Sequence, residues 1–327
     1  MTSRFGRLLS VVGYRIVLWT IALLPASLAF PLARAFGRLR YRWRWRVRQV
    51  ERTAIVSRLG ASFEQADAWQ RRAFELGVSE SLEGCLAYSL PARRFADLVE
   101  IRGLDHLKAA LERGHGAILY SGHGWGCYTF LAALGQLGLR PNFVRLGLES
   151  VLPPLQRWFY RRRFTVLERK FGCRSLCMRP DRPPPATTRP GTTTGETVAA
   201  RASIAVKSGP SVRDQVTQAL ERNEIVVILI DLSFARNNVA ARFFGETMPF
   251  PPGPAELARS TGAPLLDFFV YRTDAWVPQV AEIGPPFDAS DDLAATVQRC
   301  ATRLEEWIRR HPADWAPWHI LANRPSG

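Results

Sequence analysis

Residues 116–126 read Gly116-Ala-Ile-Leu-Tyr-Ser-Gly-His123-Gly-Trp-Gly126, an apolar run that ends in glycines around one histidine. The apolar part predicts a short buried strand, and the apolar stretch over 127–137 predicts a helix directly after it. Glu224 to Asp231 is a nearly continuous apolar run, which is typical of a central strand in a parallel sheet. Strands that alternate with helices predict an α/β fold with a mixed sheet flanked by helices.

Capping and turn residues indicate where other elements begin and end. Ser62 with Gln65 predicts a capping box that opens a helix ending before Gly77, and a second helical stretch follows over 79–89. Ser211 with Asp214 predicts a further helix start. Apolar patterns predict helices over 155–172, 254–261 and 290–310, and strands over 264–272 and 276–283. Residues 179–210 are rich in Pro, Thr and Arg without periodicity, so we expect a flexible insertion there.

Composition limits the class of protein. The 327 residues are 47% hydrophobic and 22% charged, which excludes a disordered, collagen-like or small disulfide-bonded chain. The five cysteines are odd in number and show no framework spacing, so we expect reduced thiols and no metal site. Only one segment is apolar enough to enter a bilayer, which excludes a polytopic transporter.

That segment is the uncharged run of 18 residues from Ile16 to Ala33. As a helix it would be ~27 Å long, just short of a hydrocarbon core. Pro25 and Pro31 would kink or break it, so the sequence leaves open whether it spans the bilayer or lies in its surface. The alternative is a buried first helix followed by a solvated basic one. We expect an N-terminal helical membrane-binding region over 1–60 and the α/β domain over 61–327.

Positive charge is concentrated beside this segment. The formal net charge is +15, of which residues 1–60 contribute +11 from 12 arginines and a single acid. Such a basic pole indicates a polyanionic partner, either anionic lipid or nucleic acid. Nucleic acid would leave the apolar run without a role, so we expect an anionic bilayer surface and no nucleic acid. The candidate membrane-binding residues interleave arginine with tryptophan: Arg38, Arg42, Trp43, Arg44 and Trp45.

His123 is the candidate catalytic residue. It stands at the carboxyl end of a predicted strand, where α/β sheets place ligands. A neutral imidazole can take a proton from an alcohol that attacks an acyl carbonyl. N–H groups around Gly124–Cys127, at the start of the next helix, can hold the resulting oxyanion. The alternative is a histidine with a purely structural role.

Several further motifs occur in a distinctive order. Phe243-Phe244-Gly245 precedes Gly253-Pro254-Ala255, and the chain then shows Thr261-Gly-Ala-Pro264, Glu282-Ile-Gly-Pro-Pro286, Trp315 and His319. Together with the histidine segment, this order resembles the bacterial lysophospholipid acyltransferases of the lipid A biosynthesis type. Lauroyl and myristoyl transferases and the phosphatidylinositol mannoside acyltransferase are members of that family. The resemblance spans nearly the whole chain.

The resemblance implies a glycerolipid acyltransferase-like fold and a membrane-associated acyltransferase. Such an enzyme moves a fatty acyl chain from an acyl carrier protein or acyl-CoA thioester to a hydroxyl of a membrane lipid or glycolipid, without a cofactor. Its expected place is the bacterial cytoplasmic (inner) membrane, with the catalytic domain facing the cytoplasm. His123 would be the general base. The candidate substrate-binding residues are Gly124, Gly126, Arg145, Asp231, Phe244 and Gly245.

Two of these residues carry open alternatives. Arg145 could hold a phosphate of the carrier or acceptor, or could be a solvated surface arginine. Asp231 could orient His123, could orient Arg145, or could cap the following turn.

One position departs from the family pattern. The family motif is His-x4-Glu or Asp, with the carboxylate orienting the base, and Tyr128 occupies that position here. A phenol cannot supply a full negative charge at neutral pH. Either the site has diverged toward another acceptor, or the chain is a catalytically impaired lipid-binding homologue that serves as a scaffold or partner of another lipid enzyme. Replacing Tyr128 with Glu would raise activity in a merely impaired site, lower it if Tyr128 has a new role, and leave a binding protein inactive.

Overall fold

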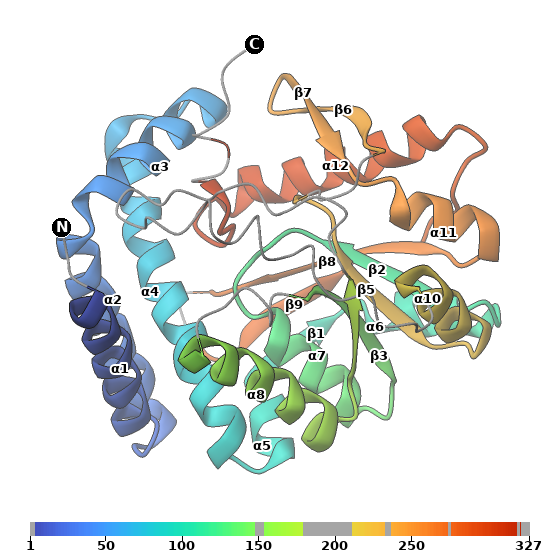
Figure 1. Cartoon of the computed structure of the whole chain (residues 1–327). Coiled ribbons are helices and arrows are strands. Elements are labelled where there is room, and N and C mark those ends of the chain that lie inside the picture. Colours follow the sequence, from blue (N-terminus) through green and yellow to red (C-terminus); the bar gives the residue numbers. More distant parts are fainter. Residues whose placement is uncertain are drawn as a thin grey trace.

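The computed structural model describes residues 4–147, 154–178, 211–232, 237–273, 276–318 and 321, without the side chains of 4–11, 45–47 and 154–155. Within these ranges the chain forms a central sheet with helices on both faces (Figure 1). The expected insertion over 179–210 lies outside the described residues.

The sheet has the strand order β1-β9-β8-β2-β5-β3-β4 within the described residues. Its neighbours pair in parallel except for β8 and β9, which are antiparallel, so the expected mixed sheet is confirmed. The strands are β1 (Val99–Arg102), β2 (Ala117–Ser121), β3 (Pro141–Leu146), β4 (Arg174–Met178), β5 (Ile225–Leu229), β8 (Leu265–Tyr271) and β9 (Gln279–Ile283). A separate hairpin, β6 (Val239–Phe243) and β7 (Glu246–Phe250), packs on α12 (Leu293–Arg310).

The central strands are buried on both faces, which explains their nearly continuous apolar sequences. Leu119 and Val227, which are partners across β2 and β5, face one hydrophobic core, whereas Ile118 and Val226 face the other. The first core is covered by α4 (Phe63–Ser89), α5 (Ala92–Ala96), α6 (Leu104–Glu112), α7 (Cys127–Gln136) and α8 (Pro154–Phe171). The second is covered by α10 (Val212–Glu221), α11 (Gly253–Thr261) and α12.

The helix expected to stop at Gly77 instead continues as α4 to Ser89, so two expected helices are one. Its start is the expected capping box of Ser62 and Gln65. A single glycine in a helix costs only about 1 kcal/mol, which the remaining turns of a 27-residue helix can offset. A Cβ at position 77 would lie 3.1 Å from the Trp125 ring, so the glycine admits that ring rather than ending the helix.

The N-terminal apolar run is divided between α1 (Arg4–Ile21) and α2 (Ala26–Trp43), which Pro25 separates. Figure 1 shows the two helices side by side at the edge of the molecule. Among the described residues, the structure contains no helix that is both long and apolar enough to cross a membrane.

Helix α2 rests on α4, and α3 (Trp45–Leu59) follows it onto the same helix. The contact between α2 and α4 is close at Gly37, where an added Cβ would lie 2.6 Å from the Cα of Glu75. Arg34 and Arg38 of α2 both pair with the carboxylate of Glu75. The buried face of α2 is therefore fixed to the α/β domain by shape and charge together.

We expect Gly37→Ala to destabilise the protein by about 1–3 kcal/mol, because the added methyl group has to push two helix backbones apart. The measurement is the free energy of unfolding in urea, in detergent. Gly84→Ala in α4 is the matched control, since no described atom lies within 4 Å of its added Cβ. Equal stabilities for the two variants would contradict the close helix contact.

Candidate active site

Strand register brings His123 and Asp231 together. Strands β2 and β5 are parallel neighbours in which Ser121 is opposite Leu229. His123 and Asp231 each come two residues after these partners, at the carboxyl ends of the two strands. Ligands of open α/β sheets bind at this edge, so the pair lies where chemistry is expected.

The side chains of His123 and Asp231 form a short, oriented contact. His123 Nδ1 lies 2.5 Å from Asp231 Oδ1, and the His123 backbone N–H donates to Asp231 Oδ2 over 2.7 Å. The carboxylate is almost completely buried, with 1% of its side chain exposed, whereas 40% of the His123 side chain is exposed. With Nδ1 bound to the carboxylate, Nε2 is the ring atom that can accept a proton from outside. Of the three roles that the sequence left open for Asp231, the structure shows the contact with His123.

The pKa values of this pair are shifted in opposite directions. Burial alone would lower the pKa of His123, but the charge and hydrogen bond of Asp231 outweigh it and raise that pKa above its ordinary value. Burial alone would raise the pKa of Asp231, but the His123 charge and the donated hydrogen bonds lower it. Asp231 therefore stays ionised and stabilises a protonated imidazole.

The loop after His123 is held by its own backbone. Gly124 N–H donates to Gly122 over 2.9 Å, and Trp125 N–H donates to the Asp314 carbonyl over 3.3 Å. These two N–H groups, which we expected to face an oxyanion, are therefore engaged. Gly126 is the N-cap of α7 with a φ of 92°, a left-handed conformation that suits glycine. The N–H groups at Gly126 and Cys127 remain the candidates at the start of this helix.

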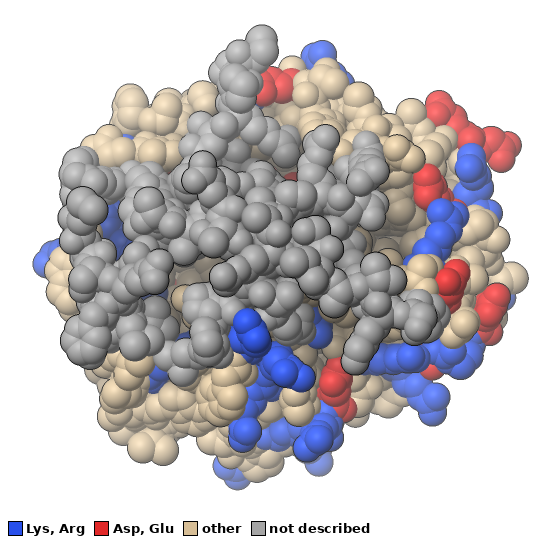
Figure 2. Space-filling model, in the orientation of Figure 1, with Lys and Arg blue, Asp and Glu red and all other residues tan. Residues whose placement is uncertain are grey.

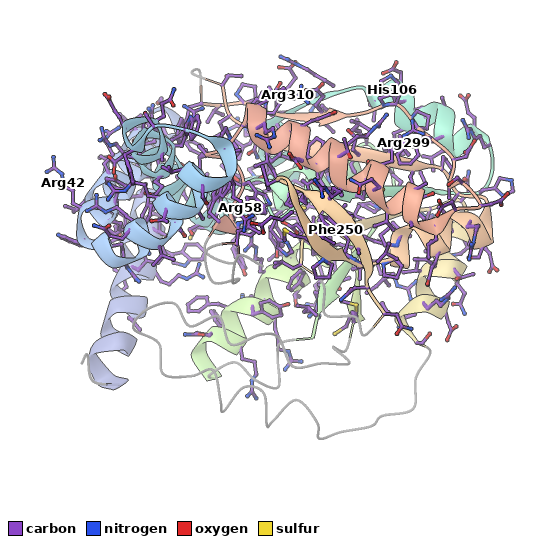
Figure 3. The ribbon with its side chains drawn as sticks, turned by 90° about the horizontal axis from the view of Figure 1, so that it is seen from above. Arg42, Arg58, His106, Phe250, Arg299 and Arg310 are labelled. Carbon is purple, nitrogen blue, oxygen red and sulfur yellow. The ribbon has the colours of Figure 1, made fainter. Side chains whose placement is uncertain are left out.

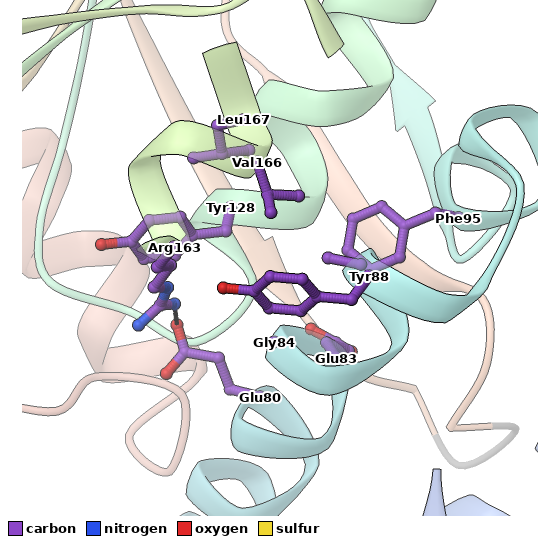
Figure 4. Close-up of a pocket in the computed structure, with 10 residues that line it drawn as sticks. Glu80, Glu83, Gly84, Tyr88, Phe95, Tyr128, Arg163, Val166 and Leu167 are labelled. Carbon is purple, nitrogen blue, oxygen red and sulfur yellow. Dashed lines mark hydrogen bonds and ion pairs between the residues drawn. The ribbon is translucent and has the colours of Figure 1, made fainter. Parts of the chain in front are cut away.

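Tyr128 lies against α4 and α8 rather than beside Asp231. The guanidinium of Arg163 sits 3.2 Å from the centre of the Tyr128 ring and pairs with Glu80 over 3.0 Å (Figure 4). The three side chains line a small, mainly apolar pocket. Burial raises the pKa of Tyr128 to about 12, so the phenol is neutral. Arg163 is thus part of a packed cluster with Tyr128 and Glu80.

The other predicted site residues are Arg145, Phe244 and Gly245. The Arg145 guanidinium packs over the Phe164 ring at 4.4 Å, and its Nη1 donates to the Leu146 carbonyl. Phe244 and Gly245 form the turn of the β6–β7 hairpin, where Phe244 is buried and has a positive φ of 52°. Phe244 N–H donates to Glu305 of α12 over 2.6 Å. These contacts give Phe244 a packing role.

The candidate membrane residues differ in their exposure. Arg38 is paired with Glu75, as described above, whereas Arg42 points away from the protein at the end of α2 (Figure 3). Trp43 is exposed and Arg44 lies between α2 and α3. The side chain of Trp45 lies outside the described atoms.

We expect Asp231→Asn to lower the pKa of His123, because burial is then opposed only by the weaker effect of the Glu80 charge. Histidine resonances titrated by NMR provide the measurement, with the His123 signal assigned from its loss in His123→Gln. The wild-type chain, titrated under the same conditions, is the reference. An unchanged His123 midpoint would show that Asp231 does not set its charge.

Comparison with known proteins places the chain in a family. The model of the bacterial lipid A biosynthesis acyltransferase family matches residues 5–138 and 202–322. The phosphatidylinositol mannoside acyltransferase of Mycobacterium tuberculosis H37Rv is 29% identical over 229 residues, which cover 68% of this chain and 58% of the relative.

The protein of the same name from Mycolicibacterium smegmatis is 27% identical over 242 residues, which cover 72% of this chain and 66% of that relative. The chain therefore spans somewhat more than half of the length of the relatives it matches. The family match covers the strand that precedes His123, the strand that precedes Asp231 and the C-terminal turn with Trp315. On this match the chain belongs to the bacterial lipid A biosynthesis acyltransferase family.

Proposed function

We propose that the protein is an O-acyltransferase that moves a fatty acyl chain from a thioester donor to a hydroxyl of a membrane glycolipid, with His123 as general base. The observation that carries the proposal is the contact between His123 and Asp231 at the carboxyl edge of the sheet. The names of the mycobacterial relatives support a glycolipid of the phosphatidylinositol mannoside kind as acceptor. Acyl carrier protein or coenzyme A would carry the donor thioester.

The reaction follows from the orientation of the imidazole. His123 Nε2 takes the proton of the acceptor hydroxyl while its oxygen attacks the thioester carbonyl carbon. Asp231 stabilises the imidazolium that forms. The carbonyl becomes a tetrahedral oxyanion, toward which the N–H groups of Gly126 and Cys127 would point. Collapse of this intermediate breaks the C–S bond, and the imidazolium returns its proton to the departing thiolate.

Asp231 would supply the carboxylate that is absent at position 128, where this chain has Tyr128. The charge that a family carboxylate would supply from the fifth position after the histidine is here supplied by Asp231, two residues after the end of β5. Tyr128 then needs only to be neutral, and its ring serves as a packing surface for Arg163. The site is therefore complete as an acid–base pair, which favours the diverged enzyme over the impaired homologue.

We also propose that α1 and α2, within the membrane-binding region 1–60, lie on the cytoplasmic surface of the inner membrane. Four side chains of α2 are exposed, apolar and spaced so that they share one helix face: Leu28, Leu32, Leu39 and Trp43. The opposite face of α2 is buried against the protein. Ile16 and Trp19 of α1, and Leu23 in the turn that follows it, are also exposed and apolar and have the same kind of spacing.

Charge around this surface suits anionic lipid. Residues 4–43 contain no acidic residue, and their arginines include the outward-pointing Arg42. In Figure 2 the side of the molecule over the tip of the α1–α2 hairpin is largely uncharged, and no acidic side chain is visible there. Apolar contact and arginine charge together would hold the site near its lipid acceptor.

An acyl-transfer assay tests the enzymatic proposal. The purified chain in detergent receives labelled acyl carrier protein or acyl-CoA with a total lipid extract of its source. We expect a labelled glycolipid, and a fall of roughly 10²–10⁴-fold in His123→Gln, because the base is lost. His106→Gln is the matched control and retains transfer. Folded protein that binds lipid but transfers from neither donor would instead identify the scaffold homologue.

A flotation assay tests the membrane surface. We expect Leu28→Glu to weaken binding to vesicles that contain phosphatidylglycerol by roughly tenfold or more, since burial of one leucine contributes about 1.5–3 kcal/mol. Leu137→Glu, at the end of α7, is the matched control because both leucines are about equally exposed, at 55% and 53%. Equal loss in both variants, or none in either, would refute a role for this face.

A further inference from the structure

A C-terminal turn over residues 311–318 lies across the loop that carries His123. Ala316 N–H donates to the His123 carbonyl over 2.9 Å, and Trp315 forms an isolated β-bridge with Gly124. Trp125 adds two bonds, from its backbone to Asp314 and from its indole to Ala313. The loop is therefore fixed on both sides of the histidine by this turn.

The side chain of Trp315 reaches beyond the loop to the carboxylate. Its Nε1–H donates to Asp231 Oδ2 over 2.8 Å. The indole is 2% exposed and packs edge to face on Trp318 at 4.9 Å between ring centres. Phe243 and Phe244 of the β6–β7 hairpin lie against it as well. This packing leaves the ring one orientation, so its N–H direction is set by the aromatic cluster.

We propose that Trp315 is a positioning residue. Its indole N–H holds the Asp231 carboxylate in the orientation in which Oδ1 faces the imidazole of His123, and it lowers the basicity of that carboxylate. Oδ2 accepts from the indole and from the His123 backbone, so Oδ1 faces the imidazole. A donor on Oδ2 draws negative charge away from Oδ1. The proton shared between Oδ1 and His123 Nδ1 then stays on the imidazole nitrogen. The catalytic part of this inference rests on the proposed acyl transfer, whereas the hydrogen bonds do not.

Loss of the indole N–H should change the pKa of His123 in a definite direction. Without the indole N–H, more negative charge remains on the carboxylate that faces the imidazole, so the imidazolium is stabilised further. The base is active only when neutral, and the acid limb of the pH–rate profile therefore moves to higher pH. A residue that only supported the fold would change the amount of active protein and leave the limb in place.

Other charged groups near the pair also have to be considered. Glu80 of α4 acts on His123 and raises its pKa to a smaller extent than Asp231. In the C-terminal turn over 311–318, burial raises the pKa of the Asp314 carboxyl to about 7. That carboxyl accepts a hydrogen bond from the backbone N–H of Arg272. Both groups are present in every variant below, so a difference between variants reports the Trp315 bond.

The first test compares Trp315→Phe with Trp318→Phe. Trp318 is 3% exposed, packs in the same cluster and donates its indole N–H to the Pro312 carbonyl over 2.8 Å, away from Asp231. We expect Trp315→Phe to lower kcat by about tenfold and to move the acid limb up by roughly 0.3–1 pH unit. The limb of Trp318→Phe stays at the wild-type position. Equal profiles for the two variants would overturn the proposal.

A second readout needs neither turnover nor the Trp315 variant. In the wild-type chain, one indole N–H resonance should titrate with the His123 imidazole, and this titration should be lost in His123→Gln even though Asp314 still titrates. If no indole resonance follows the titration of His123, the hydrogen-bond linkage is refuted. If the linkage is present but the wild-type chain transfers no acyl group, the proposed function fails and the positioning of Asp231 by Trp315 stands.

Discussion

The parallel pairing of β2 with β5 is the constraint on which the site depends. It fixes which residues meet at the carboxyl edge of the sheet, and it places Asp231 opposite His123 although the two are 108 positions apart in the chain. Both strands are buried on both faces, so a shift of their register would displace two apolar cores at once. The acid–base pair is therefore as well defined as the core beneath it.

A second buried interaction holds the helical layer against this sheet. Glu83 of α4 pairs with Arg272, which follows β8, and also accepts the hydroxyl of Thr129 from α7 over 2.9 Å. The ion pair is almost fully buried, and removing one partner would leave an uncompensated charge. Through this network α4 connects the α1–α2 hairpin to α7, the helix that follows the loop with His123. The proposed membrane surface and the site thus belong to one packed unit.

The fold class was accessible from local sequence patterns because the deciding signals are short. The apolar run before His123, the run before Asp231 and the capping residues at Ser62 and Ser211 each mark an element that the structure contains. The break expected at Gly77 was wrong because a glycine pattern does not report the Trp125 ring packed against it. The β6–β7 hairpin was missed, since its two short strands lack a strong apolar run.

The site was only partly accessible. The position of His123 after a strand identified it as a candidate. Its pairing with Asp231 depends on which strands are neighbours in the sheet, and local sequence patterns do not encode strand order. Tyr128 suggested a missing charge because the motif counts positions along one segment, whereas the carboxylate that contacts His123 is that of Asp231, which follows a neighbouring strand. The cluster of Glu80 with Arg163 joins two helices far apart in sequence, and its arginine was indistinguishable from a solvated one.

The central claim is that Asp231, rather than position 128, supplies the carboxylate of the base. Rates of acyl transfer in Tyr128→Phe, Tyr128→Glu and the double variant Tyr128→Glu with Asp231→Asn test it most directly. The account predicts that Tyr128→Phe remains active, that Tyr128→Glu gains nothing because its charge lies beside Glu80, and that the double variant stays as slow as Asp231→Asn. A sharp gain in Tyr128→Glu, or recovery of transfer in the double variant, would contradict it.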